Sequence, residues 1–165
     1  HTPIRRQRQM CIRDSIEGLL SLPIEMMTIH ASGGLEMMKA AMKAVDGSDI
    51  KIFGVTALTS LSDENTSLIF KRTAADQVNA MLDLAEQAGI DGVVCSPHEL
   101  SLVSKRKSLL SITPGIRLKD SNDDQNRVMT PKDALKLGAN YLVIGRPITE
   151  AENVKEALTE IYNSI

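Results

Sequence analysis

Five short apolar runs, each followed by a segment with helical character, constrain the fold of this chain more than any other feature of its sequence. The runs span residues 25–30, 51–58, 92–96, 109–115 and 141–145. Two of the segments that follow repeat apolar residues at i, i+3, i+4 and i+7, the spacing of one helix face. They are Val78, Met81, Leu82 and Ala85, and Val154, Ala157, Leu158 and Ile161. Regular alternation of strand and helix predicts a parallel α/β sheet covered by helices.

Two architectures satisfy this alternation. Because crossovers between parallel strands are right-handed, the sheet is either an open doubly wound sheet or a (β/α)8 barrel. A complete barrel needs about 250 residues, whereas this chain has 165. We therefore expect an α/β fold that is a (β/α)8 TIM barrel, present as roughly its last five β/α units, with roughly three units missing from the front.

Two motifs predict where helices begin. Ser96 and Glu99 have the S/T-x-x-E spacing of a capping box, and Thr149 and Glu152 repeat it. In such a box both side chains accept hydrogen bonds from backbone N–H groups that the first helical turn leaves unpaired. We expect a helix to start near each motif.

The first 14 residues differ in character from the rest of the chain. They begin without methionine, show no apolar period and crowd four arginines into a short stretch: Arg5, Arg6, Arg8 and Arg13. The sequence "RQMCIRDS" resembles the translated read-through of a sequencing adapter. We expect residues 1–14 to be a non-native or disordered tail and residues 15–165 to be the carboxy-terminal part of a barrel domain. A targeting peptide or a basic binding arm is the alternative.

Composition argues against several classes of function. The formal net charge is -2 and 2% of the residues are aromatic, so the chain lacks the basic field and the stacking platform typical of nucleic-acid binding. Its longest apolar run, residues 52–58, is far short of the roughly 20 residues of a membrane-spanning helix. Cys11 and Cys95 show no C-x-x-C or disulfide-rich pattern, which fits a reducing compartment. We expect a cytoplasmic protein that binds neither nucleic acid nor membranes.

Residues after the last two strands predict a phosphate site, because ligands of parallel α/β proteins lie at the carboxyl ends of the strands. Gly145 lets a ligand approach the backbone closely, and Arg146 adds a planar charged fork. The preceding strand ends in "TPGIR", which supplies Arg117, and a polar loop of about a dozen residues follows. Gln125 in this loop carries an amide that can bridge a phosphate to another polar part of the ligand. The alternative is a turn glycine, surface arginines and a solvated glutamine.

Several segments together carry a resemblance to a known family. "HASGG", "VTALTS", "DGVVCSPHE", "TPGIR", "NDDQNRV" and "VIGRPIT" occur in the order and spacing seen in orotidine 5'-phosphate decarboxylases of the bacterial type. The resemblance covers about residues 16–165. It implies a (β/α)8 barrel that converts orotidine monophosphate to UMP and CO2 in pyrimidine biosynthesis. The family uses neither a metal nor an organic cofactor and usually works as a homodimer.

The same resemblance implies a set of substrate-binding residues: Thr59, Arg117, Gln125, Gly145 and Arg146. Thr59 would meet the pyrimidine, Gln125 would bridge the base and the phosphate, and the remaining three would hold the phosphate.

The motif that carries the family's chemistry is absent from this sequence. The family protonates the pyrimidine carbon that loses CO2 with a lysine, held among aspartates in D-x-K-x-x-D. This motif should lie roughly 30 residues ahead of "HASGG", where the chain reads "TPIRRQ". The nearest match, Asp49 and Lys51, has Gly54 in place of the last aspartate and enters a strand at its amino end. We predict no catalytic residue in this chain and no activity of the 165-residue polypeptide alone, although the intact family enzyme is a carboxy-lyase.

Two alternative functions remain open. A sugar-phosphate decarboxylase or aldolase of the same superfamily would share the phosphate site and use a metal, although "TPGIR" together with Gln125 argues against it. A non-catalytic phosphate-binding or interaction fragment is the second alternative.

Overall fold

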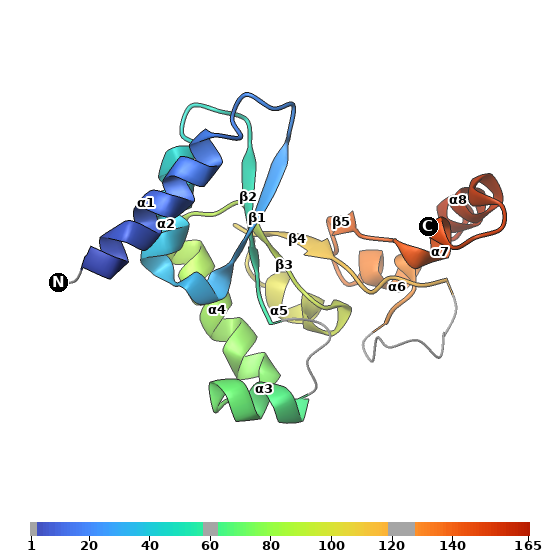
Figure 1. The fold of residues 1–165 in the computed structure, drawn as a ribbon. Helices are drawn as coiled ribbons and strands as arrows, with labels where there is room; N and C mark the ends of the chain where they lie inside the picture. The colour runs from blue at the N-terminus through green and yellow to red at the C-terminus, as the bar shows by residue number, and fades with distance from the viewer. Residues whose placement is uncertain (1–2, 58–62, 119–127) are drawn as a thin grey trace.

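The computed structural model describes residues 3–57, 63–118 and 128–165. All five predicted strands are confirmed within these residues. They are β1 (Met26–His30), β2 (Lys51–Val55), β3 (Gly92–Val94), β4 (Leu110–Thr113) and β5 (Tyr141–Leu142). They form one parallel sheet in the order β1-β2-β3-β4-β5 (Figure 1).

The strand order distinguishes between the two architectures that the sequence allowed. A doubly wound sheet reverses its order at a switch point, whereas a (β/α)8 barrel places each strand beside the next. The observed order is sequential throughout. The sheet also curves strongly, since the rings of Phe53 on β2 and Tyr141 on β5 meet edge to face with centroids 6.1 Å apart, although two strands lie between them. The sheet is therefore an arc of a barrel.

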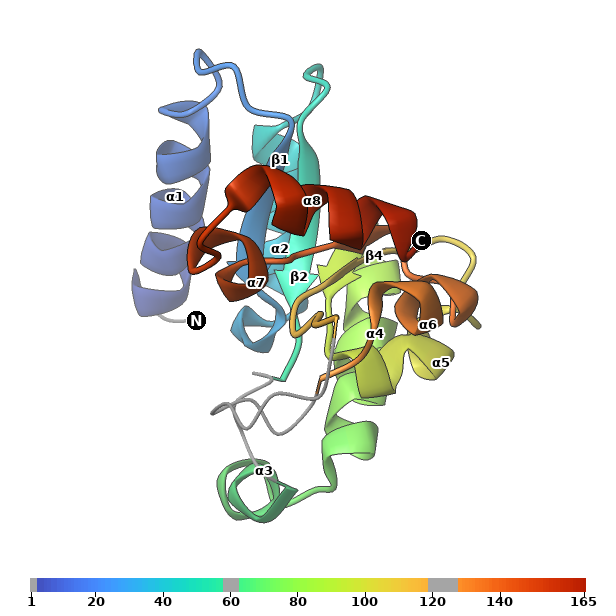
Figure 2. The ribbon, with the colours of Figure 1, turned by 90° about the vertical axis from the view of Figure 1, so that its right-hand side faces the viewer.

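Helices connect the strands along the chain. The α-helices are α1 (Pro3–Glu17), α2 (Leu35–Ala44), α3 (Asp63–Phe70), α4 (Ala74–Ala88), α5 (Leu100–Val103), α6 (Pro131–Lys136), α7 (Arg146–Thr149) and α8 (Val154–Asn163). Two short 3-10 helices, η1 (Ala31–Gly33) and η2 (Pro97–Glu99), follow β1 and β3. Figures 1 and 2 show α1, α2 and α4 on one side of β1 and β2, and α8 on the other.

The two faces of the sheet differ in burial. Ile29, Ile52 and Val93 face α2 and α4 and are at most 9% exposed, so this outer face forms the core with apolar residues of those helices. The opposite, inner face includes one register row that runs across all the strands: His30, Val55, Val94, Ile112 and Tyr141. Each residue of this inner row is partly or largely exposed. In a closed barrel the inner face is the packed interior.

The predicted helix starts had different outcomes. The Ser96 capping box is present, since the Ser96 hydroxyl accepts the His98 N–H at 3.2 Å and the Glu99 carboxylate accepts the Ser96 N–H at 3.0 Å. The predicted start at Thr149 is wrong, because Thr149 is the last residue of α7. The next helix, α8, begins at Val154 and is capped by Asn153 instead.

The amino-terminal segment is helical from Pro3 to Glu17, where the sequence predicted a tail without regular structure. Ile16 is 4% exposed in the core, and Ile12 packs against it one turn earlier. This pair orders the end of α1 against the domain. The expectation that residues 1–14 are non-native stays a prediction.

Among the described helices, none combines the length and the apolar character that crossing a membrane requires.

Candidate functional site

The candidate site lies where the chain leaves β4 and β5. The two strands are neighbours, with Ile112 beside Tyr141 and Thr113 beside Leu142. Just beyond the strands the Val143 N–H still donates to the Thr113 carbonyl at 2.9 Å. The segments that carry Arg117 and Arg146 therefore leave the same edge of the sheet from adjacent strands, as the phosphate prediction requires.

The backbone after β4 is held in a defined shape up to Arg117. Gly115 has a φ of 80°, a conformation that favours glycine. Its carbonyl accepts the Met129 N–H at 3.2 Å, and the Arg117 N–H donates to the Met129 carbonyl at 3.0 Å. The two ends of the long loop thus lie side by side, where Ile116 and Met129 form an isolated bridge.

Arg117 is 8% exposed, and its Nη1 donates to the Ile116 carbonyl at 3.0 Å. Burying a guanidinium costs free energy unless its donors are matched by acceptors or anions. Arg117 is thus held in place just after β4, where the phosphate prediction puts it.

Gly145 and Arg146 stand at the start of α7, which corrects the prediction that they precede a helix opening near Thr149. The Gly145 carbonyl accepts the N–H groups of Ile148 at 2.8 Å and Thr149 at 3.1 Å. A Cβ added to Gly145 would meet no atom within 4 Å. The backbone at Gly145 is thus open within the described protein, which is compatible with the phosphate prediction.

Thr59 and Gln125 lie outside the residues that the structure describes. The chain segments that lead to them are described. The Thr56 hydroxyl donates to the Val94 carbonyl at 2.9 Å, and the Thr56 N–H donates to the same oxygen at 3.1 Å. This pair, which the sequence analysis did not single out, fixes the exit of β2 against β3 three residues before Thr59.

Two further side chains near the strand ends, those of Cys95 and Thr113, give no indication of catalytic chemistry. Burial and, to a smaller extent, the charge of Glu99 raise the pKa of the Cys95 thiol to about 12, while an interaction with the Thr113 hydroxyl lowers it slightly. Such a thiol is neutral at neutral pH and does not act as a nucleophile. Thr113 is fully buried, and its hydroxyl interacts with the Cys95 thiol. Its side chain faces the helices, in the same direction as that of Ser111, and not the inner face.

The near match to the catalytic motif occupies the wrong end of the sheet. Lys51 is the first residue of β2 and pairs in register with Met26, the first residue of β1. Asp49 is exposed before the strand begins, and Gly54 faces the helices, where a Cβ would lie 2.9 Å from Ile90 Cδ1. Asp49 and Lys51 thus lie at the amino end of β2, and Gly54, near its carboxyl end, faces away from the inner face.

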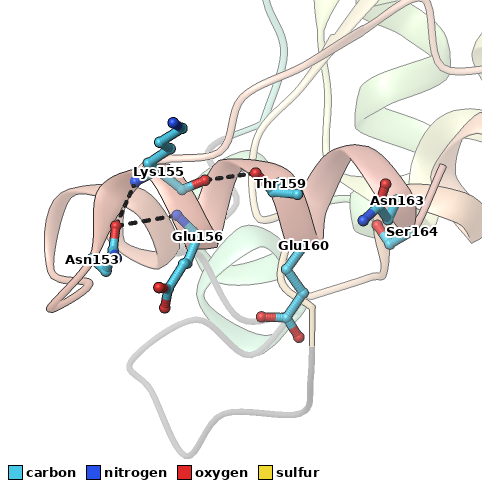
Figure 3. A pocket seen from close by; sticks show the side chains of 7 residues that line it. All are labelled: Asn153, Lys155, Glu156, Thr159, Glu160, Asn163 and Ser164. Atoms are coloured by element: carbon cyan, nitrogen blue, oxygen red, sulfur yellow. Dashed lines mark hydrogen bonds between the residues drawn. The ribbon is translucent and has the colours of Figure 1, made fainter.

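A polar hollow on α8 does not contribute to the site. Seven residues line it: Asn153, Lys155, Glu156, Thr159, Glu160, Asn163 and Ser164 (Figure 3). The Asn153 side chain accepts the N–H groups of Lys155 and Glu156, and the Thr159 hydroxyl donates to the Lys155 carbonyl. These bonds satisfy the helix itself. Within the described ranges, no group of three or more His, Cys, Asp or Glu side chains could hold a metal ion.

The comparisons with known proteins identify the family. Residues 12–161 match the model of the orotidine 5'-phosphate decarboxylase / HUMPS family. The chain is 44% identical over 154 residues to orotidine 5'-phosphate decarboxylase of Wolbachia pipientis, covering 92% of this chain and 68% of the relative. It is 45% identical over 161 residues to the enzyme of the same name from Shewanella sediminis, covering 93% and 69%.

Solved structures show the same relation. The crystal structure of orotidine 5'-phosphate decarboxylase from Lactobacillus acidophilus superposes with a TM-score of 0.78 at 33% identity, over 94% of this chain and 70% of that one. The enzyme from Thermotoga maritima, at 23% identity and a TM-score of 0.70, supports the fold alone. The chain thus corresponds to about two thirds of these barrels, and it belongs to the orotidine 5'-phosphate decarboxylase / HUMPS family.

Proposed function

We propose that this chain is the phosphate-binding portion of an orotidine 5'-phosphate decarboxylase, which converts orotidine monophosphate to UMP and CO2 in pyrimidine biosynthesis. The observation that carries the proposal is the placement of Arg117 and Arg146 after adjacent strands, with the open backbone of Gly145 beside Arg146. Two guanidinium groups suit a phosphate dianion, since each offers a planar fork of donors.

The proposed roles follow from the resemblance to the family, and the placement of Arg117, Gly145 and Arg146 at adjacent strand ends supports three of them. Arg117, Gly145 and Arg146 hold the phosphate, Gln125 bridges the phosphate and the base, and Thr59 meets the pyrimidine. Phosphate binding far from the reacting carbon stabilises the transition state when it is coupled to closure of loops around the substrate. The residues described here thus bind and orient the substrate, and the proton donor comes from a D-x-K-x-x-D segment that this sequence does not contain.

The intact enzyme is proposed to be a cytoplasmic homodimer. Leu68 and Ile69 on α3 support an interface, because they are 67% and 59% exposed and large apolar side chains of this kind are commonly covered by a partner. Among the activities that the family name combines, the decarboxylase is favoured, because the relatives that match over nine tenths of this chain bear that name.

The test uses this chain joined to the amino-terminal region of the Wolbachia relative, so that the catalytic motif is present. Arg146→Ala removes one charge-assisted contact to the phosphate and should reduce kcat/KM for orotidine monophosphate by about 2 to 4 kcal/mol, or about 30-fold to 900-fold. Gln125→Ala should cost less, because it removes a neutral group.

Two controls make the test specific. Orotidine, which lacks the phosphate, should react slowly with the parent enzyme, and Arg146→Ala should leave that rate nearly unchanged. Lys107→Ala removes an exposed positive charge before β4, at the opposite end of the same strand, and should leave both rates unchanged. Equal losses with both substrates after Arg146→Ala would show that Arg146 does not bind the phosphate.

A further inference from the structure

A group of buried polar side chains lies where the chain leaves β2, β3 and β4. Each of them is at most 5% exposed: Thr56, Cys95, Ser96, Glu99 and Thr113. An ionisable side chain such as that of Glu99 is rarely buried unless polar partners offset the loss of its hydration. The proposed substrate contacts lie on other residues, so the proposed function gives these buried side chains no role.

Glu99 closes the turn that follows β3. Its Oε2 accepts the Ser96 N–H at 3.0 Å inside the protein, and its own N–H donates to the Ser96 carbonyl at 3.0 Å. The Ser96 hydroxyl accepts the His98 N–H at 3.2 Å, and Pro97 between them is fully buried. The charge of Glu99 also raises the pKa of the Cys95 thiol, so the carboxylate lies near the end of the strand. These residues form a compact turn with the carboxylate on its buried side.

The end of β3 is bonded to both neighbouring strands. On one side the Val94 carbonyl accepts the hydroxyl and the N–H of Thr56, at 2.9 and 3.1 Å. On the other side the Cys95 N–H donates to the Ile112 carbonyl at 3.1 Å, and the Cys95 thiol interacts with the Thr113 hydroxyl. The turn after β3 therefore lies directly behind the contacts that join the ends of β2, β3 and β4.

These contacts lie between the two proposed ends of the substrate site. Thr56 is three residues before Thr59, the proposed contact to the pyrimidine. Thr113 is four residues before Arg117, one of the proposed contacts to the phosphate. Because β3 lies between β2 and β4 in the sheet, the end of β3 determines how far apart these two segments start.

We propose that Glu99 is a positioning residue: by holding the turn after β3, its carboxylate fixes the spacing between the segment that meets the pyrimidine and the segment that meets the phosphate. The inference rests on the proposed function and extends it, because a nucleoside monophosphate has to be bound at both ends at once. Glu99 acts through the backbone of Ser96 and not by contact with the substrate. A misplacement of about 1 Å far from the reacting atoms can cost about a hundredfold in rate.

Hydrogen exchange of the 165-residue chain tests the structural part of the proposal. Glu99→Ala removes the acceptor of the Ser96 N–H, so the amides of Ser96, Cys95 and Thr56 should exchange at least about tenfold faster, the equivalent of one lost buried hydrogen bond. Glu99→Gln keeps an acceptor oxygen and should stay close to the parent. The matched control is Val93→Ala, which removes a fully buried apolar group from the outer face of the same strand. It should speed exchange throughout the sheet and not at the strand ends alone.

The kinetic test uses this chain joined to the amino-terminal region of the Wolbachia relative. Glu99→Ala should lower kcat/KM for orotidine monophosphate by about tenfold to a hundredfold. It should change the slow reaction of orotidine far less, because orotidine has no phosphate to be held at the second end. Glu99→Gln should recover most of the loss, and Val93→Ala should affect the two substrates equally. If Glu99→Ala does not fold, Glu99→Asp carries the same comparison, since its carboxylate is one methylene shorter and withdraws from the Ser96 N–H.

The outcomes separate this proposal from the proposed function. Equal losses with both substrates after the substitution of Glu99, the same difference between substrates in Val93→Ala, or no recovery in Glu99→Gln would overturn the positioning role. Unchanged exchange at Ser96 and Thr56 in Glu99→Ala would overturn it as well. A joined parent enzyme that does not decarboxylate orotidine monophosphate would instead refute the proposed function, and the positioning role would fall with it.

Discussion

Asn140 is predicted to fix the position of β5, and with it that of the proposed phosphate site. Its Oδ1 accepts the Ser111 N–H at 2.8 Å and the Ser111 hydroxyl at 3.2 Å, while the Ser111 hydroxyl accepts the Asn140 N–H at 3.0 Å. Only two residue pairs join β4 and β5 in register within the described chain. The reciprocal Asn140–Ser111 pair is therefore a large part of what holds β5, three residues before Gly145, against β4.

The magnitude follows from the burial of Ser111, which is 1% exposed. Asn140→Ala leaves the Ser111 N–H and the Ser111 hydroxyl without their acceptor, and each such buried group costs about 1 to 3 kcal/mol. Because the hydroxyl can rotate toward another acceptor, we expect a total loss of about 2 to 4 kcal/mol. Ser111→Ala keeps the hydrogen bond from the backbone N–H of residue 111 to Asn140 Oδ1 and should cost about 1 kcal/mol. Asn140→Asp keeps an acceptor oxygen and should stay closer to the parent than Asn140→Ala does.

Urea unfolding followed by circular dichroism gives the overall loss of stability, and hydrogen exchange of the β4 and β5 amides gives the local loss. The protection of β4 and β5 should fall most in Asn140→Ala, while that of β1 changes little. If Asn140→Asp loses as much as Asn140→Ala, or if Ser111→Ala equals Asn140→Ala, the bonds to Oδ1 are not what holds β5.

Two further predictions concern titratable groups. Hydrogen bonds from the Ser108 hydroxyl and, to a smaller extent, from Arg106 hold the pKa of Glu86 below its usual 4.5. The stability that these contacts give the folded chain is therefore fully present above that pH and is lost as the pH falls through the lowered pKa. Glu86→Gln should therefore flatten the acid limb of a plot of unfolding midpoint against pH, and an unchanged limb would refute this. The thiol of Cys95, with its pKa of about 12 and 1% exposure, should resist a thiol reagent at neutral pH until the chain unfolds, whereas exposed Cys11 should react at once. Rapid modification of both thiols in the folded chain would contradict the burial of Cys95.

The strands could be predicted because their signal is local. Each predicted strand is a short apolar run, and buried residues of the outer face, such as Ile29, Ile52 and Val93, account for much of the signal. The exposed inner row could not be predicted from the same runs, because Val94 and Ile112 are as apolar as their buried neighbours. The sequence shows that residues on both faces are apolar enough for a protein interior, but it does not show which face is covered.

The helix after β5 shows why a motif can mislead. Thr149 and Glu152 have capping-box spacing, but Pro147 in the first turn of α7 already marks a helix start at Arg146. A proline there loses nothing by lacking an N–H, the same reasoning that identifies Pro131 at the start of α6. Thr149 is thus inside a helix and cannot adopt the extended backbone that an N-cap residue needs.

The amino-terminal helix shows what a search for periodicity does not detect. Residues 3–17 have no extended apolar period, yet Ile12 and Ile16 lie one turn apart and pack into the core. Two contacts of this kind can outweigh weak helix propensity, because tertiary packing supplies most of the stability of helices in proteins. A search for long periodicity cannot detect so short a contact face.

A sequence reveals the proposed phosphate-binding residues more readily than it reveals whether a lysine can act as the proton donor. Arg117 and Arg146 follow their strands directly, so the rule that ligands lie at the carboxyl ends of strands is enough to place them. Asp49 and Lys51 show that the right residue types are not enough. Lys51 stands at the amino end of a strand of five residues, roughly 13 Å from its carboxyl end at about 3.3 Å per residue. The four-carbon stem of a lysine does not span that distance through a packed sheet. If Arg117 and Arg146 hold the substrate as proposed, its proton donor has to come from the carboxyl end of another strand.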